Sequence, residues 1–242
     1  MTQPSSGAAR HWPLFDLVLR TPRLTLRYVD DERAASLMNL AADGVHDPGV
    51  MPFMTPWTRS KSPLLEREGM QGYWQDRATL RPDAWNLPFA VYEGDALAGA
   101  QDLRASSCAV TRTASSASWL ARRMHGRGIG KEMRAAVLHL AFSGLGAEFA
   151  SSGAFVDNMQ SIGVTKALGY VDNGWQIESR DGKPVRDLRF LLERAVWARV
   201  RRDDIEIDGL APCLPLLGVT SGTGVPQPEP SQIRSCPGCD TG

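Results

Sequence analysis

The sequence predicts an α/β (α+β) protein, a single domain in which a mixed, mostly antiparallel twisted sheet is flanked by helices. Segments with strand-like alternation and segments with helix-like periodicity are interspersed along the chain. Tight turns join several of the strand segments, which indicates antiparallel pairing. The chain has 242 residues, of which 43% are hydrophobic, and this is enough for one sizeable core.

The N-terminal half predicts a strand, two helices and a hairpin. Residues 24–28 alternate apolar and polar side chains, as a half-buried strand does. Apolar residues at helical spacing predict helices over residues 31–43 and 64–80. Between these helices, residues 44–58 are rich in glycine, proline, methionine and aromatic residues, which predicts a long loop. Residues 85–105 alternate on both sides of a Glu-Gly-Asp turn and predict a hairpin.

The C-terminal half predicts a strand–helix–strand–helix–hairpin succession. The expected elements are a strand over 115–124, a helix over 129–142, a strand over 149–156, a helix over 158–168, and a strand from 170 onward paired with 185–192. A further strand and an apolar end piece are expected within residues 199–218. The domain is therefore expected to span residues 11–218, between a loose tail over 1–10 and a disordered tail over 219–242 that is rich in proline and glycine.

Charge and hydropathy narrow the class of protein. The 27 basic and 27 acidic side chains cancel, so neither nucleic acid nor an anionic membrane is expected as a partner. No apolar stretch approaches the ~20 residues that span a bilayer, and the N-terminus lacks the apolar segment of a secretory signal. A cytoplasmic protein is expected. Cys236 and Cys239 have the spacing of a zinc knuckle, but no second ligand pair accompanies them, so no metal is expected.

Residues 125–131, HGRGIGK, place three glycines at every second position immediately before a predicted helix. A nucleotide P-loop ending at Lys131 would need glycine where His125 stands and a hydroxyl residue where Glu132 stands. A dinucleotide fingerprint would need glycine at position 131, although Glu148 follows at about the required distance of ~20 residues. Neither motif fits.

A glycine-rich turn that enters a helix can nevertheless bind a diphosphate. Its backbone N–H groups have no partners in the helix, and the helix dipole adds positive potential. Alternate glycines let the backbone approach the anion closely. The basic residues nearby are Arg122, Arg123, Arg127 and Lys131. The alternative is a simple strand-to-helix turn with solvated arginines.

The loop HGRGIG (125–130) resembles the acyl-CoA pyrophosphate loop, Q/R-x-x-G-x-G/A, of the GNAT acetyltransferase family, with His125 in the usual Gln or Arg place. Residues 156–174 resemble the strand–Asn–helix–"LGF/LGY" segment that follows it in that family. The resemblance covers residues 24–192. Residues 10–17, 46–58, 118–120 and 208–218 further resemble an actinobacterial branch that includes a mycobacterial succinyltransferase-like protein.

This resemblance implies an acyl-CoA-dependent N-acyltransferase that moves an acetyl group, or a succinyl group, from coenzyme A to a primary amine by direct attack. The residues that it assigns to the donor are Trp119, Leu120, Ala121, His125, Gly126, Arg127, Gly128, Ile129, Gly130, Lys131, Asn158 and Ser161. Asn158 would bind the pantetheine, and the Ser161 hydroxyl would protonate or hydrogen-bond the sulfur. The structural alternative for both is a helix N-cap and a first-turn residue.

The base that deprotonates the amine is left open among Asp102, His46 and His125, and ordered water is a fourth candidate because a free amine has a pKa of about 10. The 44–58 loop is expected to form part of the acceptor wall. Its candidate contacts are His46, Met51, Phe53 and Trp57, with Trp85 across the groove. The alternative for the apolar members is an ordinary core position.

Two further functions stay open. The lack of an obvious base leaves a non-catalytic, acyl-CoA-binding regulatory protein of the same fold. The glycines and Glu148 leave an NAD-type oxidoreductase. The acceptor could be a protein N-terminus, a lysine, a small amine or an antibiotic, and relatives of similar layout modify ribosomal-protein N-termini. Homodimer formation through the apolar C-terminal segment is a further expectation.

Overall fold

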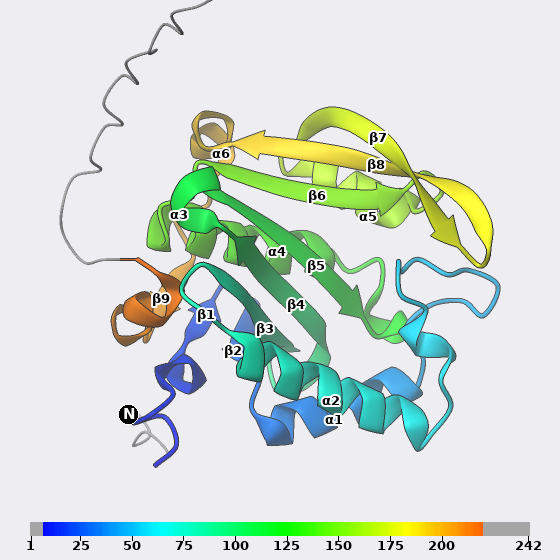
Figure 1. Cartoon of the computed structure of the whole chain (residues 1–242), viewed down its shortest axis with the longest axis horizontal. Coiled ribbons are helices and arrows are strands. Elements are labelled where there is room, and N and C mark those ends of the chain that lie inside the picture. Colours follow the sequence, from blue (N-terminus) through cyan, green and yellow to red (C-terminus); the bar gives the residue numbers. More distant parts are fainter. Residues whose placement is uncertain (1–6, 220–242) are drawn as a thin grey trace, which may run out of the picture.

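Nine strands form one open sheet in the order β7-β8-β6-β5-β4-β3-β2-β1-β9 in the computed structural model, which describes residues 7–219 (Figure 1). The strands are β1 (Val18–Arg20), β2 (Leu24–Tyr28), β3 (Ala84–Glu93), β4 (Ala96–Ser106), β5 (Thr113–Leu120), β6 (Phe149–Phe155), β7 (Val171–Arg180), β8 (Lys183–Glu193) and β9 (Glu206–Asp208). All neighbouring pairs are antiparallel except β5 and β6. The predicted fold class is confirmed.

Helices cover both faces of the sheet. They are α1 (Asp31–Ala42), α2 (Leu64–Thr79), α3 (Cys108–Thr111), α4 (Ile129–His139), α5 (Met159–Ala167) and α6 (Arg194–Val200). On one face, Ala90 and Ala100 of the central strands cluster with Leu37 of α1 and other residues of α1 and α2. On the other face, Leu103 of β4 clusters with Met133 of α4 and its neighbours. The sheet therefore separates two apolar cores, and α1 and α2 pack together beneath it in Figure 1.

Most predicted elements are present close to their predicted limits, but the predicted strand over 115–124 was wrong at its end. Strand β5 stops at Leu120, and a 3₁₀ turn over Arg122–Met124 follows. The Ala121 N–H donates to the Ala98 carbonyl of β4, and the Met124 N–H turns back to the Ala121 carbonyl. Strand β1 and the short helices α3 and α6 were not predicted, because three to seven residues carry too little periodicity.

The chain enters α4 through two glycines in the left-handed region, Gly126 at φ 75° and Gly128 at φ 77°. An L-residue with a side chain is strained in this conformation, so these two positions need glycine. Gly128 is the N-cap and offers no side chain to the first turn. The following helix buries Ile129, Met133 and Val137 against the sheet, which anchors the loop at a defined place.

The C-terminal segment packs on its own domain. Strand β9 pairs with β1, and a 3₁₀ segment over Ala211–Leu217 follows it. Cys213 and Leu217 are buried in the chain's own core. Homodimer formation through this segment stays a prediction. Most of the predicted tails, residues 1–6 and 220–242, lies outside the described residues. The same is true of Cys236 and Cys239. Within residues 7–219, no helix is long and apolar enough to cross a membrane.

Candidate active site

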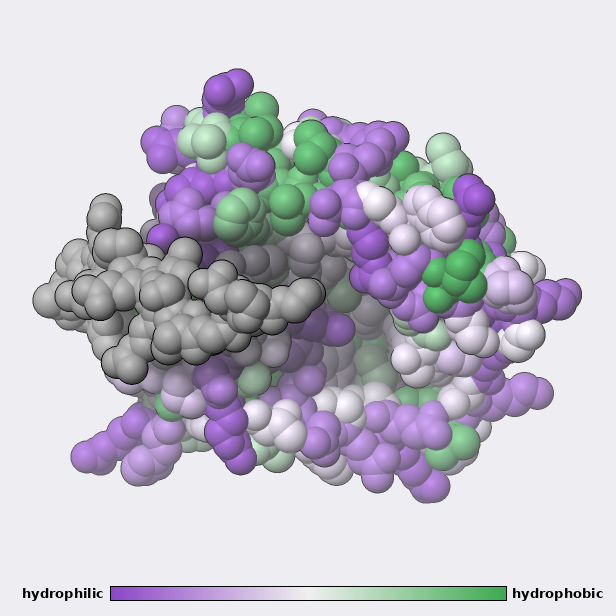
Figure 2. Space-filling model, turned by 45° about the horizontal axis from the view of Figure 1, so that its top comes forward, coloured by the Kyte–Doolittle hydropathy of each residue, from purple (hydrophilic) through white to green (hydrophobic). Residues whose placement is uncertain are grey.

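The two parallel strands in the middle of the sheet pair only at their beginnings. Thr113, Ala114 and Ser115 of β5 pair with residues 149–151 of β6, and no register continues beyond Ser115. The strands diverge from this point, as Figure 1 shows, while β5 stays paired with β4 as far as Leu120. One edge of β5 is therefore not paired with β6 from residue 116 onward. The surface is hollowed on the side of the molecule where the strands diverge (Figure 2).

The contacts of β5 show which of its backbone groups face this gap. The Ala121 N–H donates to Ala98 of β4, and the Ala117 carbonyl accepts a bond of 2.9 Å from the Gln101 side chain of β4. In an extended strand, the N–H and C=O groups of one residue point to the same edge, and those of the next residue point to the other. The backbone groups of 117, 119 and 121 therefore face β4.

The backbone groups of Ser118 and Leu120 consequently face the gap. This corrects the expectation for Trp119, Leu120 and Ala121, because only Leu120 of the three directs its backbone toward a molecule lying between the strands. Ser118 was missed as a backbone donor, although strand alternation alone places it in the same set as Leu120. The Trp119 ring lies on the α1–α2 face, where its centroid is 5.7 Å from that of Trp57.

The glycine loop presents unpaired donors at the open end of the gap. The backbone N–H groups of residues 126–131 donate to no backbone carbonyl within the described part of the chain. Gly126, Arg127 and Gly128 are exposed, so these donors are not covered by neighbouring segments. A Cβ placed on Gly128 would find only the Arg23 guanidinium, at 3.6 Å. Together with the α4 dipole, this arrangement fits the binding of an anion such as a diphosphate.

The cations around the loop are not equivalent. Arg127 forms an ion pair of 2.5 Å with Glu93, which offsets its charge. Arg23, which sequence reasoning missed, lies beside Gly128 and pairs with Glu132 at 2.8 Å. Among residues 7–219, no carboxylate lies within ion-pair distance of the exposed Lys131. Lys131 is thus the cation of the loop that is most available to a phosphate.

His125 is engaged with its own chain. Its Nε2 atom is 3.1 Å from the Leu120 carbonyl oxygen, so the ring ties the loop to the end of β5. The predicted contact of the His125 side chain to the donor stays a prediction, and Nε2 is already occupied by the Leu120 carbonyl. The bond fixes the loop relative to the strand edge, and it occupies one lone pair of a carbonyl that faces the gap.

Asn158 and Ser161 follow β6 across the gap. The Asn158 Oδ1 atom accepts a bond of 3.1 Å from the Ser161 N–H and caps α5. The cap uses only the carbonyl oxygen, so the amide N–H₂ group of Asn158 is still available to a ligand. The Ser161 carbonyl accepts the Thr165 hydroxyl at 2.8 Å, and Thr165 in turn accepts Arg134 of α4 at 2.7 Å. These bonds hold α5 against α4 on the face of the sheet opposite α1.

Asp102 lies on the α1–α2 face, directly opposite Ala117 in the β4–β5 register. Its side chain is 17% exposed and pairs with Arg104 at 2.6 Å. Burial raises the pKa of Asp102, and the attraction of Arg104 opposes this effect without cancelling it. A carboxylate with a raised pKa is a stronger base than an ordinary aspartate. Asp102 lies one strand away from the gap, because β5 separates β4 from β6.

A second carboxylate, which sequence reasoning missed, is linked to Asp102. The Asn86 amide donates to Asp76 of α2 at 2.8 Å, and Arg104 donates to the Asn86 carbonyl at 3.2 Å. Burial, together with the nearby Asp102 charge, raises the pKa of Asp76 to about 6. The same burial raises the pKa of Tyr73, one turn earlier on α2. No motif in the sequence connects these residues, since they come from three separate elements.

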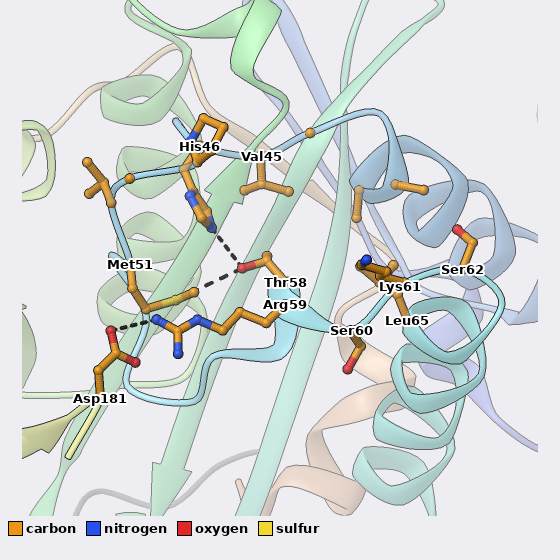
Figure 3. Close-up of a pocket in the computed structure, with 16 residues that line it drawn as sticks. Val45, His46, Met51, Thr58, Arg59, Ser60, Lys61, Ser62, Leu65 and Asp181 are labelled. Carbon is orange, nitrogen blue, oxygen red and sulfur yellow. Dashed lines mark hydrogen bonds and ion pairs between the residues drawn. The ribbon is translucent and has the colours of Figure 1, made fainter.

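His46 and Met51 line a cavity of about 540 Å³ between the α1–α2 loop (residues 43–63) and the β7–β8 hairpin (Figure 3). His46 Nε2 lies 2.7 Å from the Thr58 hydroxyl, and Nδ1 lies 2.9 Å from the Asp47 carbonyl. Because both ring nitrogens have partners within the loop, His46 holds the loop together and is a poor candidate for the base.

The aromatic candidates lie on opposite faces of the sheet, and Phe53 and Trp57 pack against the core of the α1–α2 face. Phe53 and Trp57 lie side by side with ring centroids 5.3 Å apart, and Trp57 continues to Trp119. Trp85 is 4% exposed in the core on the other face of the sheet, with Leu87 among its cluster. This corrects the expectation that Trp85 lies across the groove: an odd-numbered position in β3 points it toward α4.

A smaller cavity of about 350 Å³ lies at the closed end of the gap. Its lining includes the four serines at the point of divergence, Ser115, Ser116, Ser151 and Ser152, and also Asp187 and Arg189 of β8. Asp187 is nearly buried and pairs with Arg189 at 2.9 Å. The cavity is thus polar and hydroxyl-rich, with a compensated ion pair at one side.

Glu148 does not support the dinucleotide interpretation. It pairs with Arg112 at 2.8 Å and with Arg194 at 3.3 Å, so its carboxylate joins elements of the fold. The mostly antiparallel sheet also differs from the parallel, doubly wound sheet that binds dinucleotides. Within residues 7–219, no three His, Cys, Asp or Glu side chains are grouped so as to hold a metal ion.

Solved acetyltransferase structures share this fold. RimL, described as the ribosomal L7/L12 alpha-N-protein acetyltransferase in complex with coenzyme A, aligns over 73% of this chain and 97% of its own, at 16% identity and a TM-score of 0.62. Mycobacterium smegmatis RimJ, with bound CoA-disulfide, aligns over 75% of this chain and 88% of its own, at 20% identity and a TM-score of 0.60.

A chimera of the spermidine N-acetyltransferase SpeG from Vibrio cholerae and hSSAT aligns over 73% of this chain and 99% of its own, at 16% identity and a TM-score of 0.58. At these identities the likeness shows the fold. The sequence itself matches the domain family described as "Acetyltransferase (GNAT) domain" over residues 23–171, which include the glycine loop and the start of α5. Since this match spans more than half of the chain, the protein belongs to the GNAT family of acetyltransferases.

Proposed function

We propose that the protein transfers an acetyl group from acetyl-CoA to a primary amine by direct attack of the amine on the thioester. The observation that carries this proposal is the glycine loop. The N–H groups of residues 126–131 have no backbone partner in the described chain and lie at the open end of the β5–β6 gap, and residues 126–128 and 131 are exposed. A diphosphate on these donors leaves the pantetheine directed along the unpaired edge of β5.

The edge of β5 supplies groups for the thioester. Leu120 and Ser118 direct their backbone groups into the gap, so Leu120 can pair with the pantetheine amide while the Ser118 N–H donates to the carbonyl oxygen. That oxygen gains negative charge as the amine attacks, and a fixed N–H donor there lowers the barrier. Asn158 contributes its amide N–H₂ group from the far side of the gap, while its oxygen caps α5.

Proton transfer is divided between the two faces of the sheet. Asp102, on the α1–α2 face, accepts a proton from the ammonium form of the acceptor, and the neutral nitrogen attacks the carbonyl carbon. As the C–S bond breaks, the Ser161 hydroxyl on α5 donates a proton to the departing sulfur. The nitrogen loses its second proton as the amide forms, and this proton returns to Ser161 through water. The raised pKa of Asp102 supports its role, since a base titrating closer to neutral pH removes an amine proton more readily.

The acceptor is a primary amine that enters from the α1–α2 side. Asp76 and Asp102 outnumber the single Arg104 in their cluster, so an ammonium group is attracted there. His46, Met51, Phe53 and Trp57 supply the wall of the α1–α2 loop. The similar structures are described as acting on a ribosomal-protein α-amine and on spermidine, so a peptide with a free N-terminus and a polyamine are the first acceptors to test.

Succinyl-CoA is a second donor to test. The observation that favours it is the cavity of about 350 Å³ at the closed end of the gap, which exceeds the needs of an acetyl group. Its four serine hydroxyls can solvate a terminal carboxylate. Arg189 is already paired with Asp187, so the hydroxyls and not this guanidinium are the expected contacts.

Calorimetric titration with acetyl-CoA, succinyl-CoA and NAD tests the donor, and release of free thiol in the presence of a panel of amines tests the reaction. Binding of an acyl-CoA with amine-dependent thiol release is expected. Binding without thiol release from any amine would support the non-catalytic, acyl-CoA-sensing alternative. Binding of neither acyl-CoA would contradict the assignment of the loop.

A further inference from the structure

Arg180, at the end of β7, contacts three parts of the molecule that are distant in sequence. Its Nη1 and Nη2 atoms lie 2.9 and 2.7 Å from the two carboxylate oxygens of Asp157. Nη1 also donates to the Met51 carbonyl at 3.3 Å. Its guanidinium carbon lies over the Phe155 ring, 4.5 Å from the centroid. The side chain is 17% exposed, so most of it is enclosed by these partners.

The partners of Arg180 belong to two different substrate sites. Phe155 ends β6, and Asp157 immediately precedes Asn158, the N-cap of α5 on the donor side of the gap. Met51 belongs to the α1–α2 loop and lines its cavity. One guanidinium therefore joins the corner that carries Asn158 to the loop that forms the acceptor wall.

The neighbouring residue of the hairpin makes a parallel contact. Asp181 pairs with Arg59 of the α1–α2 loop at 2.6 Å, and both residues line the cavity (Figure 3). It is more exposed, with side-chain exposures of 55% for Arg59 and 38% for Asp181, so solvent weakens it. The β7–β8 hairpin thus holds the loop by one enclosed contact, at Arg180, and one exposed contact, at Asp181. The segment after β5 also contacts this loop, through the Arg122 N–H and the Gly44 carbonyl.

We propose that Arg180 is a positioning residue that couples the donor site to the acceptor loop: donor bound against Asn158 steadies Asp157, and through Arg180 it orders residues 43–63 for the amine. Arginine is required because one planar guanidinium must satisfy two carboxylate oxygens and a carbonyl while stacking on an aromatic ring. The proposal rests on the donor site proposed above, but not on the identity of the acceptor.

Hydrogen–deuterium exchange of the full chain, with and without coenzyme A, tests the coupling. In the unsubstituted protein, coenzyme A is expected to slow amide exchange both at 126–131 and across 43–63. In Arg180→Met, slowing at 126–131 is retained, and slowing across 43–63 is lost. With an amine that the enzyme accepts, the KM for that amine rises at least about fivefold, while the Kd for coenzyme A stays within about twofold.

Arg186→Met is the matched control. Arg186 lies on the same hairpin and stacks on Trp175, 4.6 Å from the ring centroid. Within residues 7–219, its side chain forms no hydrogen bond or ion pair with the α1–α2 loop, unlike that of Arg180. The Arg186→Met substitution also removes an arginine side chain and a similar stacking interaction. Its exchange pattern with coenzyme A is expected to match that of the unsubstituted protein. Arg180→Lys keeps the charge but cannot bridge all three oxygen atoms, so it restores the slowing across 43–63 only in part.

Asp157→Asn removes the ion pair from the other side and serves if Arg180→Met does not fold. It is expected to reduce the slowing across 43–63 in the same way. The coupling is overturned if coenzyme A slows exchange across 43–63 as much in Arg180→Met, or in Asp157→Asn, as in the unsubstituted protein. That result leaves the donor site intact. Absence of slowing at 126–131 in the unsubstituted protein removes the donor site, and the coupling with it.

Discussion

Replacing Gly128 with alanine tests the loop on which the assigned chemistry depends. Gly128 has φ 77°, and its Cβ would lie 3.6 Å from Arg23 Nη2, so alanine meets no steric clash. The cost to folding is backbone strain of about 1–2 kcal/mol. It is reduced by about 0.4–1 kcal/mol, because alanine restricts the unfolded chain. A net loss near 1 kcal/mol corresponds to a fall in Tm of about 2–4 °C for a domain of this size.

The effect on the ligand should be larger than this change in stability suggests. The new methyl group would stand among the exposed N–H groups at the start of α4, where a diphosphate must approach the backbone closely. We expect the Kd for coenzyme A to rise at least tenfold, which is about 1.4 kcal/mol. Urea unfolding measures the stability, and titration calorimetry measures the Kd.

Gly146→Ala separates strain from obstruction. Gly146 has φ 70° and open space around its Cβ, as Gly128 nearly does, but it follows the C-terminal end of α4. It should lose a similar stability and keep the Kd for coenzyme A of the unsubstituted protein. The reasoning about the loop is refuted if Gly128→Ala binds coenzyme A as tightly as Gly146→Ala does.

Four further outcomes are expected. Asp102→Asn lowers kcat by about 10²–10⁴ without changing the Kd for coenzyme A. Because the pKa of Asp102 is raised, the rate of the unsubstituted enzyme should fall on the acid side at a higher pH than an ordinary aspartate would give. A pH–rate profile measures this. Ser161→Ala lowers kcat and leaves both KM values unchanged in steady-state kinetics, because the Asn158 cap bonds the backbone N–H of position 161 and survives the substitution. The pKa of Asp76 is about 6 in the folded state and about 3.9 in the unfolded state. Its ionised form therefore lowers the free energy of unfolding above pH 6, and this loss vanishes below pH 4. In urea unfolding, Asp76→Asn should stabilise the protein at pH 8 and not at pH 3.5. Trp85→Ala lowers the free energy of unfolding by about 3–5 kcal/mol. At a temperature where the variant stays folded, an unchanged KM for the amine agrees with the core position of Trp85. A raised KM would instead indicate that Trp85 contacts the acceptor.

Local sequence signals were sufficient for several parts of the site. Asn158 as a helix N-cap, the hairpin of β3 and β4, and the start of α4 after Gly128 follow from side-chain chemistry and periodicity within a few residues. The loop could be predicted for the same reason, because unpaired N–H groups at a helix start and the need for positive φ are properties of neighbouring residues.

Other parts depended on pairing between distant segments. Trp85 could be placed on either face until the β3–β4 register put it opposite Ala105 and toward α4. Likewise, the register of β5 against β4 decides that Ser118 and Leu120, and not Trp119 and Ala121, present their backbone to the gap. A shift of one residue would reverse both assignments, and nothing within either strand records the register.

The sequence by itself determined the order of elements, the glycine loop before a helix that no side chain caps, and the family, because each arises from residues close together in the chain. Only the tertiary structure decided the divergence of β5 from β6, the carboxylate pair of Asp76 and Asp102, and the contacts of Arg180. Each of these joins segments tens of residues apart. Their proximity follows from how the helices and loops pack on the sheet, and that packing is a property of the whole fold.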